Sequence, residues 1–155
     1  MRRNRSSEPD ADTRDIALGL LARREHSRDE LRRKLESRGF DAGDVNSLLD
    51  KLAAERLQSD TRFAESYIRA RAARGFGPVR IRVELRERGV SDALIDEYLD
   101  EHAQRWRDAL YAQYRKRFGD KPANDYRERA RRGRFLQQRG FSTDMIGRLL
   151  DELNR

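Results

Sequence analysis

Three stretches of the sequence decide the fold: Leu35-Glu36-Ser37-Arg38-Gly39-Phe40, Leu85-Arg86-Glu87-Arg88-Gly89-Val90 and Leu136-Gln137-Gln138-Arg139-Gly140-Phe141. They align without a gap and recur about every 50 residues, a period typical of repeat proteins. In each stretch a leucine is followed by an Arg-Gly pair. Glycine readily adopts the left-handed conformation that ends a helix, so we expect a helix to end at each pair.

The residues on either side of each stretch predict two neighbouring helices. Asp41, Ser91 and Ser142 follow the three stretches, and each offers a side-chain oxygen to cap the next helix. Upstream, Ser27-Arg28-Asp29-Glu30 is a capping box, and Pro78 suits the first position of a helix. The corresponding helix of the last repeat is expected to begin near Asp125. Each of these pairs is preceded by one more apolar-periodic segment, so the pattern predicts nine helices.

The sequence thus predicts an all-α protein of three tandem three-helix repeats, each resembling a helix-turn-helix unit. The expected boundaries are 12–58, 59–104 and 105–155, after a polar tail, 1–11, expected to be disordered. One such unit has only a marginal core of its own, so neighbouring units should pack together. We therefore expect an elongated, curved array.

The composition argues against catalysis. The 155 residues include no cysteine and two histidines, which excludes thiolate sites and leaves few metal ligands. His26 and His102 fall in different repeats, without a metal-ligand spacing to a partner. Asp96 and Asp100 share a helix face, but such pairs are usually solvated. We expect no enzyme activity, no cofactor and no metal, and a soluble, cytoplasmic, monomeric protein without a membrane segment.

Charge is distributed unevenly along the chain, whose formal net charge is +7. A basic cluster occupies the first two helices of the middle repeat, whereas residues 92–101 carry five acids and no Lys or Arg. A second basic run lies in the last repeat. These clusters predict contacts with a phosphate backbone, although a solvated helix face is the plain alternative. The expected contact residues are Arg69, Arg71, Arg74, Arg80, Arg82, Arg86 and Arg88 in the middle repeat, and Arg127, Arg131 and Arg134 in the last.

The turn Gly75-Phe76-Gly77-Pro78 is a second candidate for contact with a ligand. It ends at a helix N-terminus, where free backbone amides favour a phosphate. It lacks the Lys-Ser/Thr pair of a nucleotide-binding loop, so nucleotide binding is unsupported. The simpler interpretation is a turn that joins two helices. Most aromatic residues occupy apolar core positions, and Phe76 is the exception that we expect to be less buried.

Several motifs together resemble the bacterial RecX regulatory proteins, over roughly residues 12 to 155. The resemblance implies binding to the RecA recombinase, above all to its filament on single-stranded DNA. It also implies inhibition or modulation of the RecA ATPase and of strand exchange, in DNA recombination, repair and the SOS response. The matching segments are Asp60-Thr61-Arg62-Phe63-Ala64, Gly75-Phe76-Gly77-Pro78-Val79-Arg80-Ile81 and Arg88-Gly89-Val90-Ser91 in the central signature, Ser27-Arg28-Asp29-Glu30-Leu31 in the first repeat, and Arg134-Phe135-Leu136 with Arg139-Gly140-Phe141 in the last.

Two other functions remain open from the residues themselves. A helix-turn-helix regulator that reads duplex DNA alone would place its third helix in the major groove, and that helix should be basic or neutral. The third helix of the middle repeat is instead strongly acidic, which argues against this function. A helical adaptor that binds only protein is the other alternative, and the arginine cluster would then be incidental.

Overall fold

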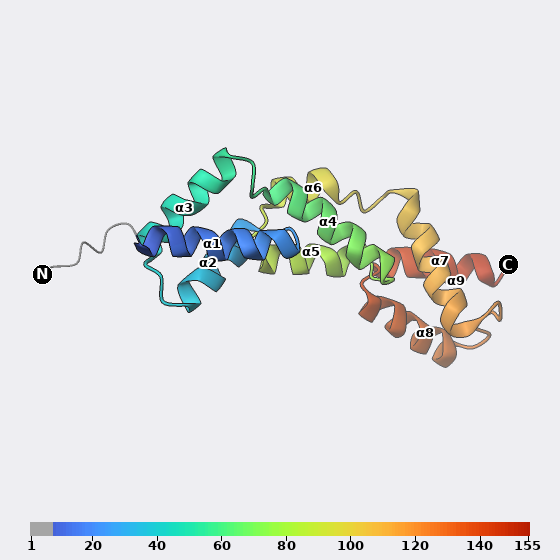
Figure 1. Cartoon of the computed structure of the whole chain (residues 1–155). Helices are drawn as coiled ribbons and strands as arrows, with labels where there is room; N and C mark the ends of the chain where they lie inside the picture. The colour runs from blue at the N-terminus through green and yellow to red at the C-terminus, as the bar shows by residue number, and fades with distance from the viewer. Residues whose placement is uncertain (1–7) are drawn as a thin grey trace, which may run out of the picture. The chain divides into compact units, whose positions relative to one another are not determined.

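The computed structural model describes residues 8–155, with side chains from residue 11 onward. Within this range the chain forms nine α-helices and no β-strand, which confirms the all-α class (Figure 1). No helix in this part of the chain is both long and apolar enough to cross a membrane. The helices are α1 (Glu8–Arg23), α2 (Arg28–Ser37), α3 (Ala42–Ala54), α4 (Asp60–Ala73), α5 (Pro78–Glu87), α6 (Asp92–Tyr98), α7 (Gln104–Phe118), α8 (Tyr126–Arg139) and α9 (Thr143–Leu153).

The predicted helix ends are confirmed at all three Arg-Gly pairs. Gly39, Gly89 and Gly140 have φ angles of 90°, 76° and 105°, in the region that favours glycine. The helix starts are confirmed as well. Ser27 and Glu30 form a complete capping box at α2, and Pro78 is the first residue of α5. The other predicted caps also accept backbone amide protons at the helix starts: Asp41 at α3, Ser91 at α6 and Ser142 at α9. Helix α8 begins directly after Asp125, close to the predicted start, and Asp125 caps it.

The N-terminal tail differs from the expectation. Helix α1 begins at Glu8, so residues 8–11 are helical rather than disordered. Pro9 is compatible with this start, because a helix leaves its first amides without intrahelical acceptors and a proline there loses no hydrogen bond. The remainder of the expected tail, residues 1–7, lies outside the described residues.

The first compact unit comprises residues up to 66 together with 86–94. Helices α1, α2 and α3 contact one another here and enclose one apolar cluster (Figure 1). Polar contacts connect this cluster to the rest of the unit. The amide of Arg28 donates to Asp60 at 2.8 Å, and the hydroxyl of Ser27 donates to the carbonyl of Arg88 at 2.7 Å. The cluster consists of Ala17, Leu31, Leu35, Val45, Leu48, Leu49 and Leu52.

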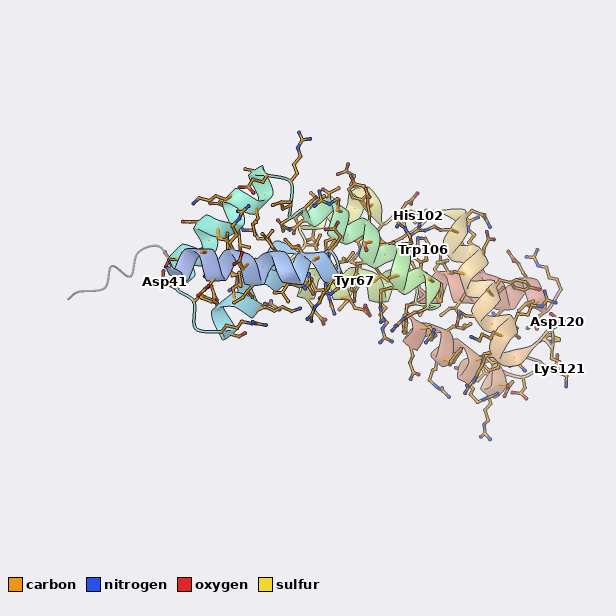
Figure 2. All side chains as sticks on the ribbon, viewed as in Figure 1. Asp41, Tyr67, His102, Trp106, Asp120 and Lys121 are labelled. Carbon is orange, nitrogen blue, oxygen red and sulfur yellow. The ribbon has the colours of Figure 1, made fainter. Side chains whose placement is uncertain are left out.

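The second compact unit comprises residues 67–85 and 95–155. Helices α7, α8 and α9 enclose its apolar cluster of Leu110, Tyr114, Leu136, Phe141, Ile146, Leu149 and Leu150. A buried arginine fixes the connection between α7 and α8. Arg132 donates to the Tyr114 hydroxyl at 2.5 Å and to the Lys121 carbonyl at 2.6 Å, and Lys121 lies in this connection in Figure 2.

Candidate functional site

The Phe76 side chain, in the turn between α4 and α5, is covered by three arginines of the second unit. The guanidinium carbons of Arg71, Arg80 and Arg139 lie 3.9, 4.3 and 4.1 Å from the centre of its ring. The face of an aromatic ring carries partial negative charge, so each guanidinium is attracted to it. Phe76 is half-buried by these contacts, which agrees with the expectation that it is less buried than the core aromatics.

One carboxylate serves this group of three cations. Glu84 accepts from Arg71 at 2.7 and 2.8 Å and from Arg80 at 3.1 Å, and it also accepts from the Tyr67 hydroxyl. Burial acts to raise the pKa of Glu84, but the hydrogen bonds from two arginines and a tyrosine leave it below its ordinary value. Around Phe76, three positive charges therefore face one negative charge.

Arg139 is the cation of this group that has no carboxylate partner among the side chains described, residues 11–155. Its guanidinium donates to the carbonyl of Arg74 at 2.5 Å, while its buried Nε has no hydrogen-bond partner. Burial lowers the pKa of Arg139, and the positive charges of Arg80 and Arg71 lower it further. A guanidinium in these surroundings favours an approaching anion, because the anion would offset like-charge repulsion.

The turn that carries Phe76 packs against the Arg139-Gly140 turn of the last repeat. The Gly77 amide donates to the Arg139 carbonyl at 2.8 Å, and the Val79 amide donates to the Gly140 carbonyl at 2.9 Å. A Cβ at Gly77 would lie 2.5 Å from the Gly140 oxygen, so only glycine fits. These amides are thus occupied and do not serve a phosphate, whereas the simpler interpretation of Gly75-Phe76-Gly77-Pro78 as a helix–helix turn fits the observed contacts.

Three other arginines of the middle cluster are engaged in ion pairs. Arg82 on α5 bonds Asp96 at 2.8 Å and Glu101 at 2.7 Å, and its side chain is only 19% exposed. The acidic residues after α5 thus neutralise this arginine. In the first unit, Arg86 bonds Asp92 at 2.7 Å, and the Nε of Arg88 lies 4.0 Å from Glu30.

The expected contact residues with unpaired, exposed side chains are Arg69, Arg74, Arg127 and Arg134. All four belong to the second unit. Among residues 11–155 their guanidiniums have no ion-pair or hydrogen-bond partner. Arg131 is different, because it forms an ion pair with Glu128 at 2.6 Å. Hydrogen bonds from Arg131 and then Arg132 lower the pKa of Glu128 to about 2.

Sequence reasoning missed two residues that the structure brings forward. Arg139 was assigned only to the end of a helix, because it occupies the same position in its stretch as Arg38 and Arg88 do in theirs. Tyr126, the first residue of α8, is 86% exposed, more than any other large apolar or aromatic side chain in the described chain. Its place directly after the helix cap Asp125, outside the apolar periodicity of α8, was the available signal.

Within the described residues, no group of three or more histidine, aspartate or glutamate side chains is arranged to hold a metal ion. Asp96, part of the Asp96/Asp100 pair weighed as a metal site, is bound to Arg82. The Asp100 carboxylate accepts from the amide of His102 at 3.0 Å, and His102 lies in the connection between α6 and α7 (Figure 2).

Comparisons with known proteins cover most of the chain. Models described as the first, second and third three-helix domains of RecX match residues 14–52, 59–99 and 105–150. The chain is 50% identical over 133 residues to "Regulatory protein RecX" of Halorhodospira halophila, covering 86% of this chain and 83% of that protein. It is 47% identical over 137 residues to the protein of the same name from Pseudomonas savastanoi pv. phaseolicola, covering 88% of each. The crystal structure of RecX from Lactobacillus salivarius has the same fold, with a TM-score of 0.80 and 23% identity over 96% of this chain and 98% of that one.

Proposed function

The chain belongs to the RecX family of regulatory proteins, and from this premise we propose that it binds the RecA recombinase and its filament on single-stranded DNA. It inhibits or modulates the RecA ATPase and strand exchange, and thereby recombinational repair. It does so without catalysis and without a cofactor, as a monomer in the cytoplasm. The observation that carries this proposal is the match to all three RecX domains, with 50% identity to a regulatory protein of that name.

The cations of the second unit supply the contact surface in this proposal. Arg69 lies on α4 and Arg74 in the turn after it, and both are exposed and without a partner among the side chains that the structure describes. Phe76 follows in the turn after Arg74, and the three arginines on its ring, Arg71, Arg80 and Arg139, share the single carboxylate of Glu84, so positive charge exceeds negative charge there. A polyanionic filament would be attracted to such a surface, and the attraction would weaken as salt rises.

The alternative of a helix-turn-helix regulator that reads duplex DNA finds less support. Helix α6 spans only Asp92–Tyr98, and two of its three acidic side chains, Asp92 and Asp96, pair with arginines that precede the helix. A short acidic helix is a poor reader of the major groove, whose flanking phosphates repel carboxylates.

The test measures RecA ATPase on single-stranded DNA with substoichiometric amounts of this protein. We expect a lower rate and co-sedimentation with the filament. A separate titration of duplex DNA with this protein, without RecA or single-stranded DNA, measures the duplex binding that the alternative function requires. An unchanged ATPase rate without co-sedimentation would overturn the proposal, and tight binding to duplex DNA alone would favour the helix-turn-helix regulator.

A further inference from the structure

A shallow groove between α8 and α9 has no role in the proposal above. Its volume is about 320 Å³, at the lower end of the range of roughly 300–1,000 Å³ for small-ligand sites. Small residues keep it open, because Ala130, Gly133 and Gly147 line it and nothing lies within 4 Å of a Cβ built at Gly147. Ile146 and Leu150 add apolar surface.

Tyr126, the first residue of α8, is one of the residues that line this groove. Tyr126 is 86% exposed, whereas no other large apolar or aromatic side chain described is more than half exposed. It has no partner among the described residues, so neither packing nor a hydrogen bond explains an aromatic ring here. A flat exposed ring is the surface on which an unstacked nucleobase stacks.

The charged residues that line the groove are basic. They are Arg129 and Arg134, with no acid among the lining residues. Arg129 pairs with Asp151, whereas Arg134 and the neighbouring Arg127 are exposed and have no partner in the described part of the chain. Gln137 and Thr143, also in the lining, offer hydrogen-bonding groups to the edge of a base.

A second groove in the same unit differs from the first in its charge. It lies between α7 and α9, has a volume of about 370 Å³ and is also lined by a tyrosine, Tyr111. Its lining includes Asp108 and Glu152 as well as Arg107 and Arg148, so it carries no excess of positive charge. Size and aromatic content are therefore similar, and charge distinguishes the two grooves.

We propose that the α8–α9 groove holds a base of single-stranded nucleic acid, stacked on Tyr126, while Arg127 and Arg134 contact the adjoining phosphates. This deepens the proposed function and rests on it for the biological setting, because it gives the last repeat a direct contact with the single strand. The binding itself requires no RecA. Sequence preference should be weak, since every base has a face that can stack.

The first test uses an oligo-dT that carries one 5-iododeoxyuridine, bound to the full chain at low salt without RecA. After irradiation, peptide mass spectrometry should place the cross-link on the peptide that contains Tyr126. Tyr126→Ala should weaken binding of the oligonucleotide by about 5- to 150-fold, the loss of one stacked base, whereas Tyr126→Phe should bind normally. Tyr111→Ala is the matched control and should also bind normally.

A second variant tests the groove without removing the tyrosine. Gly147→Leu fills open space inside α9, so the fold should be kept while oligonucleotide binding falls. Gly19→Leu makes the same change at an open, exposed position of α1 and should leave binding unchanged. Arg134→Gln should reduce the slope of log affinity against log salt by about 0.7.

Three results would each overturn the inference: no measurable binding of the oligonucleotide, a cross-link that maps elsewhere, or equal effects of Tyr126→Ala and Tyr111→Ala. A groove that serves a protein partner would appear as Tyr126→Ala losing RecA binding while oligonucleotide binding stays intact. The two proposals fail separately. Normal inhibition of RecA without a Tyr126 cross-link overturns only the groove, and a Tyr126 cross-link without any effect on RecA overturns only the regulatory function.

Discussion

Arg139 contacts the Phe76 turn through both its side chain and its backbone carbonyl. Its guanidinium carbon lies 4.1 Å from the centre of the Phe76 ring, and its carbonyl accepts the amide of Gly77, the next residue after Phe76. Two turns that are far apart in the sequence thus fix one another within the second unit. The turn Gly75-Phe76-Gly77-Pro78 consequently stabilises the packing of α4 and α5 against the end of α8, and it is also part of the candidate contact surface.

Replacing the Phe76 ring should weaken the packing between these two turns. Phe76→Ala removes the surface on which three guanidiniums rest, and we expect a loss of about 1–3 kcal/mol of unfolding free energy. Urea denaturation followed by circular dichroism measures it. Phe76→Tyr keeps the aromatic face and should retain most of the stability, whereas Phe76→Leu keeps apolar volume alone. Equal stability of the Tyr and Leu variants would show that the aromatic face contributes nothing.

The close approach of Gly77 to Gly140 predicts a steric effect. Gly77→Ala places a Cβ 2.5 Å from the Gly140 oxygen, which should cost about 1–3 kcal/mol because backbone must move. Gly19→Ala is the control, since it adds a Cβ in open space on α1 and should stabilise by roughly 0.5–1 kcal/mol. Thermal unfolding of both variants measures the difference. A Gly77→Ala protein as stable as the parent would contradict the observed turn contact.

Charge reversal is best aimed at arginines that the fold does not use. Reversal of Arg82 would break two ion pairs, so its effect on binding would be mixed with an effect on folding. Arg69→Glu combined with Arg74→Glu avoids this, and should weaken binding to the RecA filament by about tenfold while helix content is unchanged. Co-sedimentation with filaments over a range of salt concentrations measures the effect.

The control for this reversal changes the same charge elsewhere. Arg23→Glu combined with Lys51→Glu alters two exposed cations of the first unit that have no partner among residues 11–155. If both double variants lose filament binding equally, net charge alone is responsible and the proposed surface is wrong.

His26 predicts a dependence of stability on pH. His26 is 2% exposed. Lys34 donates to the His26 Nε2 at 3.0 Å, while the His26 Nδ1 donates to the Arg24 carbonyl at 3.1 Å. Burial lowers the pKa of His26 below its ordinary value of 6.5. The unfolded chain therefore binds a proton that the folded chain resists, so stability should be full above about pH 6.5 and fall as the pH drops toward the folded pKa.

Urea midpoints between about pH 8 and pH 5 measure this loss, in a range where most carboxylates stay ionised. His26→Gln removes the titrating group, so its midpoint should be lower at pH 8 but nearly flat across the range. A parent protein whose midpoint is equally flat would show that His26 does not govern stability here.

The local structure could be predicted from the sequence because it depends on neighbouring residues. The Arg-Gly pairs ended helices α2, α5 and α8 as expected, since only glycine adopts the required backbone conformation cheaply. The caps at Ser27, Asp41 and Ser142 likewise act within three residues of themselves. The start of α1 was misjudged, because a polar composition alone does not show where a helix begins to fray.

The surroundings of Arg74, Arg82 and Arg139 were decided by tertiary structure. In the sequence, Arg82 and Arg74 look equally available, yet the fold places two carboxylates around Arg82 and none at Arg74. Arg139 and Phe76 are more than sixty positions apart, so no local pattern brings them together. The sequence by itself determined the nine helices of residues 8–155, their ends apart from the start of α1, and the family, because these depend on short-range backbone preferences and matched motifs. Only the packing of distant turns and helix faces determined that Arg82 is neutralised, that Arg139 lies on the Phe76 ring and that Tyr126 stays more exposed than the other aromatic residues described.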